Sequence, residues 1–176
     1  LLVPLFYIFF LSREVVLVIL AMLMSVVVIF ELLRLKNKKL NQELLKVFDG
    51  VYRENEAKKV STLIFTLSGI FFTILFFEKG IAILAIFFLT FGDGFAALVG
   101  EKYGRHKVTG LKSWEGVSTN FLTCLVTGYI FSFFASVSLL QIVAGSLTAT
   151  VIEILPTKDN LLIPIVSGYV MKLVGH

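Results

Sequence analysis

Cysteine, charged residues and histidine are scarce in this chain, and each scarcity removes a class of function. The single cysteine, Cys124, allows neither a disulfide framework nor a CxxC metal site within one chain. His106 has no second histidine near it, so a histidine metal site is not expected. Only 16% of the 176 residues are charged and 57% are hydrophobic, which is more apolar surface than a soluble fold of this length can bury. The composition therefore predicts an integral membrane protein.

The basic residues are concentrated in a few polar connections. The formal net charge of +4 would suggest a nucleic-acid partner if the charges were spread, but 13 of the 16 Lys and Arg residues lie in 34–59, 101–116 and 156–160. The other three basic residues are Arg13, Lys79 and Lys172. By the positive-inside rule the three basic connections lie in the cytoplasm, and no nucleic acid is expected as a partner.

Seven apolar segments alternate with the polar connections. They are about 1–11, 14–33, 60–77, 80–100, 117–136, 139–155 and 161–175. We predict an all-α polytopic membrane protein of about seven transmembrane helices, in a single domain over 1–176. A span needs about 20 residues, so 1–11 or 161–175 is alternatively re-entrant or interfacial. No signal peptide is evident, and we expect 1–11 to be the tail of a longer span and 34–59 to continue as a surface helix.

Asp93 is the first candidate for a functional side chain. It lies inside a predicted span, where an ionised carboxylate is costly and marks function by default. Gly92 and Gly94 flank it with backbone that can approach a ligand closely. On a helix, one face would carry Asp93, Ala96, Ala97, Gly100 and Gly104. The alternative is a helix-packing seam of small residues, but packing does not require an aspartate.

A second candidate site precedes the span at 117–136. Ser113 is predicted to be the N-cap of that helix, and Lys112 places a cation beside its N-terminus. With the backbone N–H groups near Glu115 and Gly116, Lys112 forms a ready phosphate site. The alternative is a simple capped helix in which the dipole favours Glu115. The spacing of glycines does not fit a Walker A loop.

A third polar group surrounds the last predicted connection. Glu153 lies near the end of one span, and Asp159 and Asn160 precede Pro164 in the next. Asp159 or Asn160 alternatively caps the last helix. Mg²⁺ that accompanies nucleotide phosphates is bound by one or two carboxylates, and Asp93 shares the cytoplasmic boundary with this acid pair. Arg53 and Glu56 form either a weak further motif or a solvated junction.

At these residues the sequence resembles the family of CTP-dependent lipid kinases, which includes dolichol kinase, phytol kinase and the fungal CTP-dependent diacylglycerol kinase. The resemblance covers roughly 31–170 and rests on three motifs in order. They are Gly92-Asp93-x-x-Ala96-x-x-x-Gly100-x-x-x-Gly104, Lys112-Ser113-x-Glu115-Gly116 and Asp159-Asn160-Leu161-x-x-Pro164. Two features depart from the family: a basic-plus-His motif is absent from the first helix, and Lys158 stands where relatives tend to have a first acid.

The resemblance implies phosphorylation of a lipid alcohol, such as dolichol or another polyprenol, at the cytoplasmic membrane face. CTP would be the phosphoryl donor and Mg²⁺ the cofactor. Asp93, Glu153 and Asp159 would be both metal ligands and catalytic residues. The implied nucleotide-binding and phosphate-binding residues are Gly92, Gly94, Gly100, Gly104, Arg105, Lys107, Lys112, Ser113, Glu115, Gly116 and Asn160.

Two other functions remain open from the residues. The first two motifs are also similar to phosphatidate cytidylyltransferases, which would release pyrophosphate rather than CDP. A transporter would use Asp93 and Glu153 as a cation path, and it should place its acids near mid-span on broken helices.

Overall fold

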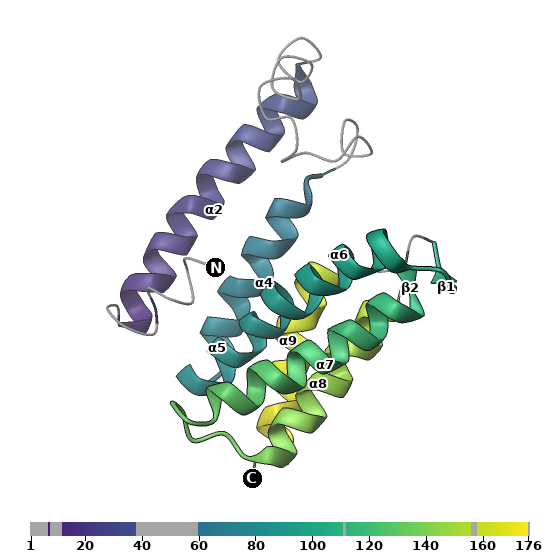
Figure 1. Ribbon diagram of the computed structural model, residues 1–176. Helices are drawn as coiled ribbons and strands as arrows, with labels where there is room; N and C mark the ends of the chain where they lie inside the picture. Colours follow the sequence, from purple (N-terminus) through teal and green to yellow (C-terminus); the bar gives the residue numbers. More distant parts are fainter. Residues whose placement is uncertain (1–6, 8–11, 38–59, 111, 156–157, 176) are drawn as a thin grey trace.

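The computed structural model describes residues 7, 12–37, 60–110, 112–155 and 158–175 (Figure 1). The helices are α2 (Arg13–Lys36), α4 (Thr62–Phe76), α5 (Lys79–Phe87), η2 (Phe88–Asp93), α6 (Gly94–Tyr103), α7 (Trp114–Phe131), α8 (Leu139–Ile154) and α9 (Asp159–Val174). The strands are β1 (Lys107–Thr109) and β2 (Lys112–Ser113). Because α5, η2 and α6 form one continuous helix, each apolar segment predicted from residue 14 onward corresponds to one helix.

Two of the described helices are long and apolar enough to cross a membrane: Arg13–Lys36 and Lys79–Tyr103. The helices α4 and α8 are apolar but shorter, so the prediction of about seven transmembrane helices is not confirmed. Segment 1–11, apart from Tyr7, lies outside the described residues. The same holds for 38–59, which includes Arg53 and Glu56 and most of the expected surface helix.

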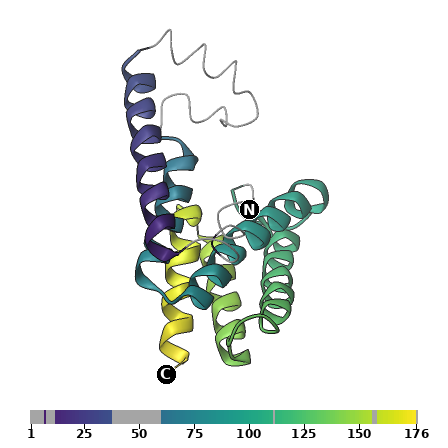
Figure 2. The same ribbon diagram turned by 90° about the vertical axis from the view of Figure 1, so that its left-hand side faces the viewer.

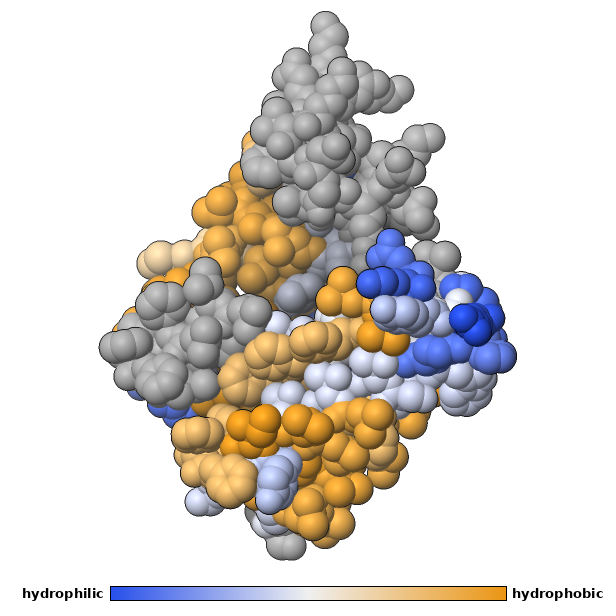
Figure 3. All heavy atoms as spheres, in the orientation of Figure 1, coloured by the Kyte–Doolittle hydropathy of each residue, from blue (hydrophilic) through white to orange (hydrophobic). Residues whose placement is uncertain are grey.

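The distribution of apolar side chains fits a bilayer environment. On α2, Val18, Met22 and Val26 are exposed; a helix that is apolar on its outward face loses little in lipid and much in water. Hydrophilic side chains gather instead where α6 ends and the β1–β2 hairpin lies (Figure 3). The described part of the molecule therefore has a polar end at the hairpin, on a largely apolar helical body.

The core is built around α5. Residues 81–86 are all buried, as expected of a helix that is hydrophobic on every side. Figure 2 shows α2 and α4 on one side of the molecule and α6 and α7 on the other, with α8 and α9 between them. Small residues allow close packing: a Cβ at Gly128 would lie 2.5 Å from Ile142, which ties α7 to α8.

Two features near the polar end depart from the expected regular helices. The connection 104–113 forms an antiparallel hairpin, in which Lys107 pairs with Ser113. Gly110 turns this hairpin with φ +55°, a left-handed conformation that favours glycine. The second feature is η2, a π-helical segment that ends at Asp93. Single wide turns of this kind occur frequently at functional sites, and this one sets where Asp93 points.

Candidate functional site

Three carboxylates from three different helical segments meet at the polar end. Asp93 ends η2, Glu153 lies in the last turn of α8, and Asp159 begins α9. One carboxylate oxygen from each lies within 4.8 Å of the other two. We call these three residues the acid cluster. The structure thus brings together the three residues that the sequence predicted as metal ligands.

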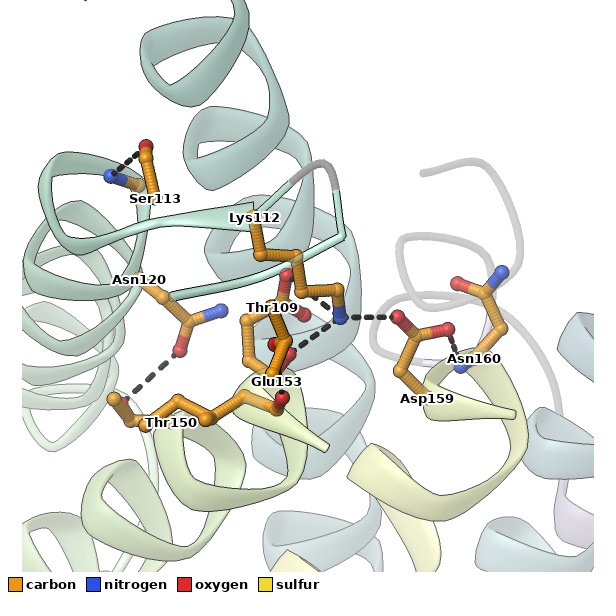
Figure 4. Close-up of polar contacts among 10 residues, drawn as sticks. Thr109, Lys112, Ser113, Asn120, Thr150, Glu153, Asp159 and Asn160 are labelled. Atoms are coloured by element: carbon orange, nitrogen blue, oxygen red, sulfur yellow. Dashed lines mark hydrogen bonds and ion pairs between the residues drawn. The ribbon is translucent and has the colours of Figure 1, made fainter. Parts of the chain in front are cut away.

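Lys112 on β2 joins two members of the acid cluster (Figure 4). Its Nζ lies 2.7 Å from Asp159 Oδ2 and 3.1 Å from Glu153 Oε1, and it also donates to the backbone oxygen of Glu153. Burial lowers the pKa of Lys112, but the hydrogen bond to Asp159 and the charges of both acids outweigh it and raise the pKa above its usual value. Lys112 therefore stays protonated at neutral pH.

The two acids around Lys112 differ in how their remaining oxygens are used. Asp159 Oδ1 accepts a hydrogen bond of 2.9 Å from the backbone N–H of Asn160. Glu153 is 6% exposed, and its Oε2 has no hydrogen-bond partner among the described residues. The cap position of α9 is Lys158, without a side-chain cap. The alternative that Asp159 or Asn160 caps this helix is therefore not the one observed, because both lie inside its first turn.

A cavity of about 500 Å³ opens beside the acid cluster. Its lining consists of Asp93, Ala96, Ala97, Gly100, Glu101, Lys107, Lys112, Ser113, Gly116, Val117, Glu153 and Asp159. The face predicted for Asp93, Ala96, Ala97 and Gly100 is therefore confirmed as a shared face. Glu101 and Val117 are lining residues that the sequence did not single out.

The remaining predicted residues do not line this cavity. They are Gly92, Gly94, Gly104, Arg105, Glu115 and Asn160. Arg105 is exposed in the connection that follows α6. Glu115 accepts from His106 Nδ1 at 2.7 Å and so fastens the start of α7 to the hairpin. This hydrogen bond lowers the pKa of Glu115 to about 2. His106 is thus a carboxylate partner in the described structure.

The N-terminus of α7 is held close to α6 by small residues. Ser113 caps α7, because its Oγ accepts from the N–H of Gly116 at 3.2 Å, and this confirms the predicted N-cap. A Cβ on Gly104 would lie 2.6 Å from Ser113 Oγ, and one on Gly116 would lie 2.9 Å from the oxygen of Ala96. Gly104 and Gly116 therefore serve the packing of α6 on α7, which the alternative interpretation proposed for Gly104.

The two glycines that flank Asp93 have different surroundings. A Cβ on Gly92 would lie 2.6 Å from Cys124 Sγ and 3.2 Å from Asn120 Nδ2. A Cβ on Gly94 would meet no atom within 4 Å. Gly92 thus lets η2 approach α7, whereas ligand approach remains a prediction for Gly94.

Asn120 and Thr150 are polar residues near the site that the sequence analysis missed. Asn120 is fully buried on α7, and its Oδ1 accepts from Thr150 Oγ1 of α8 at 3.2 Å. Asn120 stands in an apolar segment, which is the same signal that identified Asp93. Asn120 could therefore have been identified as a candidate site residue from the sequence.

The acid cluster has the chemistry of a site for a hard divalent cation. All of its donors are carboxylate oxygens, which Mg²⁺ prefers. Glu153 and Asp159 share the cation Lys112, and three carboxylates this close to one another favour uptake of a further positive charge. Asp93, Glu153 and Asp159 therefore fit the metal that the sequence analysis expected.

Comparisons with known proteins identified several kinases. The CTP-dependent diacylglycerol kinase 1 of Saccharomyces cerevisiae is 24% identical over 83% of this chain and 59% of its own length. The phytol kinase of Synechocystis sp. is 43% identical over 40% of this chain and 34% of its own. Phytol kinase 1, chloroplastic, of Arabidopsis thaliana is 28% identical over 64% and 42%.

The chain spans between 34% and 59% of the length of these three relatives. No family model and no solved structure matches it.

Proposed function

Since the chain is related to the family of CTP-dependent lipid kinases, we propose that it transfers the terminal phosphate of CTP to the hydroxyl of a lipid alcohol. The observation that carries the proposal is the acid cluster with Lys112 on the wall of one cavity. Phosphoryl transfer needs mainly positioning and stabilisation of charge on phosphate oxygens. Carboxylates, a lysine and a capped helix N-terminus supply both.

In this reaction each group on the cavity wall has a separate task. Lys112 and Lys107 neutralise negative charge on the phosphates of CTP, and the first amides of α7 add hydrogen-bond donors. The alcohol oxygen forms a bond to the terminal phosphorus while the bond to the bridging oxygen breaks. CDP leaves with that electron pair, and the hydroxyl proton passes to a carboxylate of the acid cluster.

Asp93, Glu153 and Asp159 would hold Mg²⁺ when the nucleotide is present. The ion would supply positive charge against the donor phosphates. The chain's own contribution is to keep three acids from η2, α8 and α9 at one place, with Lys112 fixed between two of them.

The proposed acceptor is a lipid alcohol, a class that includes phytol, dolichol and diacylglycerol. Such a lipid presents its hydroxyl at the membrane interface, while CTP is dissolved in the cytosol. The acid cluster and Lys112 lie at the polar end of an apolar helical body, where the two substrates can meet. We propose that this end faces the cytoplasm.

A transport function fits the arrangement less well. Of the two acids expected to form a cation path, Asp93 lies within the helix Lys79–Tyr103 at its π-helical segment, as a transporter would require. Glu153 lies at a helix end and is bridged to Asp159 by Lys112, which does not fit a path of acids near mid-span. A cytidylyltransferase uses the same nucleotide, so the products must separate it from a kinase.

Product analysis tests the proposal. Purified protein is incubated with CTP, Mg²⁺ and, in separate reactions, phytol, dolichol or diacylglycerol. The kinase reaction releases CDP and a lipid monophosphate. Release of pyrophosphate with a lipid phosphate as substrate would assign the chain to the cytidylyltransferases instead.

A further inference from the structure

Two buried polar side chains on α7 and α8, the helices beside and within the acid cluster, lack partners for one polar atom each. Asn120 and Ser146 are each 0% exposed. Asn120 Nδ2 and Ser146 Oγ have no hydrogen-bond partner among the residues that the structure describes, and Glu153 Oε2 shares this condition. Unpaired polar atoms inside a membrane protein are costly. Alanine or leucine would pack at these positions without that cost, so packing does not account for them.

Asn120 adjoins the wall of the cavity. Asn120 follows Gly116 by one helical turn of α7, and Gly116 lines the cavity. Its Nδ2 is 3.2 Å from the position of a Cβ on Gly92, the residue that precedes Asp93. The missing side chain at Gly92 thus leaves room for the Asn120 amide beside the acid cluster.

The α8 side of the same region completes the arrangement (Figure 4). Thr150 Oγ1 lies 3.2 Å from Asn120 Oδ1 and donates to the backbone carbonyl oxygen of Ser146 at 2.8 Å. Ser146, Thr150 and Glu153 follow one another at intervals of four and three residues, so they share one face of α8. A polar strip therefore runs from Glu153 into the helical bundle.

We propose that this strip binds the acceptor hydroxyl of the lipid alcohol, an inference that rests on the proposed function. A hydroxyl offers one donor and two acceptor lone pairs. It would donate to Glu153 Oε2 and accept from Asn120 Nδ2, with Ser146 Oγ as a further partner. Each atom left unpaired in the protein would gain a partner of the right kind.

The placement assigns the two substrates to opposite sides of the acid cluster. Lys107, Lys112 and the N-terminus of α7 surround the cavity side, which suits nucleotide phosphates. The strip lies on the bundle side, which suits a lipid that carries a single polar group. Attack from the side opposite the leaving group is the arrangement that in-line phosphoryl transfer requires.

A binding measurement without nucleotide tests this site. Native mass spectrometry of the purified protein in detergent compares phytol with the matching hydrocarbon that lacks the hydroxyl. The wild type should bind phytol about tenfold more tightly, the size expected for roughly one to two hydrogen bonds. Equal binding of the two lipids would overturn the proposal, and would indicate that water pairs these atoms instead.

Variants separate this role from a structural one. Asn120→Leu and Ser146→Ala should each reduce the preference for phytol over the hydrocarbon. They should raise the KM for the alcohol and leave the KM for CTP unchanged. Thermal stability should be retained, since each change removes an unpaired buried group and Thr150 keeps its hydrogen bond to the backbone oxygen of Ser146 when Asn120 is replaced. Loss of stability with an unchanged phytol preference would assign the strip to packing.

Ser167→Ala is the matched control. Ser167 is also 0% exposed, but its hydroxyl donates to the oxygen of Ile163 in α9. This variant should retain the wild-type preference for phytol, and a loss equal to that of Ser146→Ala would count against the site.

The outcomes distinguish this inference from the proposed function. A wild type that prefers phytol but transfers no phosphate from CTP would support the hydroxyl site and refute the kinase proposal. A wild type that phosphorylates phytol without any hydroxyl preference in binding would refute the site alone.

Discussion

Charge and position of single side chains govern the proposed chemistry at the residue scale. Asp93, Glu153 and Asp159 are predictable from sequence, because acids in or beside apolar segments are rare and costly. Their meeting within 4.8 Å depends on the fold. The partners of Lys112 were not predictable, because they come from α8 and α9.

Asp93→Asn tests the metal role of the acid cluster. The amide keeps the size of the side chain but removes the charge, and a neutral amide is a poor substitute for a carboxylate that holds Mg²⁺. Activity should fall by about 100-fold or more, with insertion and folding retained. Steady-state rates at saturating Mg²⁺ measure the effect.

Glu101→Gln is the control for this change, because Glu101 lines the same cavity outside the acid cluster. It should keep near-normal turnover. Near-normal turnover by Asp93→Asn as well would return the Asp93 motif to a packing role.

Lys112→Ala should weaken both nucleotide binding and the folded state. The change removes charge-assisted hydrogen bonds worth on the order of 1–3 kcal/mol and leaves Glu153 and Asp159 without their cation. The KM for CTP should rise, and added Mg²⁺ should raise the melting temperature more than in the wild type. Enzyme kinetics and thermal unfolding measure these effects, and Lys102→Ala, at an exposed lysine outside the cavity lining, should leave both unchanged.

The pH dependence of the stability that Lys112 contributes follows from its raised pKa. A group whose pKa is raised on folding stabilises the protein at pH values below its unfolded pKa, which is 10.5 for lysine. This stabilisation is lost as the pH rises through the pKa in the folded state. The stability difference between wild type and Lys112→Ala should therefore be no smaller at about pH 9 than at about pH 7. A difference that vanishes by about pH 9 would show that Lys112 is not held as a cation.

Regular helices were predictable at the element scale, and local irregularities were not. Apolar runs predict the helices from α2 to α9, and Ser113 predicts the start of α7. The π-helical turn at η2 has no comparable sequence signal, because it depends on how Gly92 packs against α7. The hairpin was missed although Gly110 follows the β-branched pair Val108-Thr109.

Gly104→Ala tests the contact between α6 and the start of α7. Its Cβ would press on Ser113 Oγ and on the oxygen of Gly100, and such overpacking costs about 1–3 kcal/mol. Chemical unfolding measures the loss. Gly94→Ala, where the Cβ meets no atom within 4 Å, should instead be neutral or gain up to about 1 kcal/mol from helix propensity. Equal stability of the two variants would contradict the packing account of Gly104.

The orientation of the whole molecule is a prediction from its basic connections. Lys102→Cys places a label site in 101–116, and the native Cys124 is 0% exposed and should react little. A membrane-impermeant maleimide should fail to label Lys102→Cys in intact cells and should label it in inverted vesicles. Phe134→Cys, at a position 82% exposed in the connection before α8, should show the opposite pattern. Labelling of Lys102→Cys from outside would overturn the proposed cytoplasmic site.

Composition predicts the helices of the described residues and the presence of candidate membrane spans, but it does not predict the number of spans. Several helices, such as α4 and α8, are shorter than a bilayer requires, and their neighbours cover part of their surface. Counting apolar segments therefore predicts the helices but not which of them cross the membrane.

Positional labelling of the nucleotide tests the central claim most directly. Purified protein is given phytol or diacylglycerol with CTP labelled either at the terminal phosphate or at the phosphate attached to the ribose. Phosphoryl transfer predicts that the terminal label enters the lipid fraction while the other label stays in CDP. Appearance of the ribose-attached label in the lipid would contradict the account, because it would show transfer of a cytidylyl group.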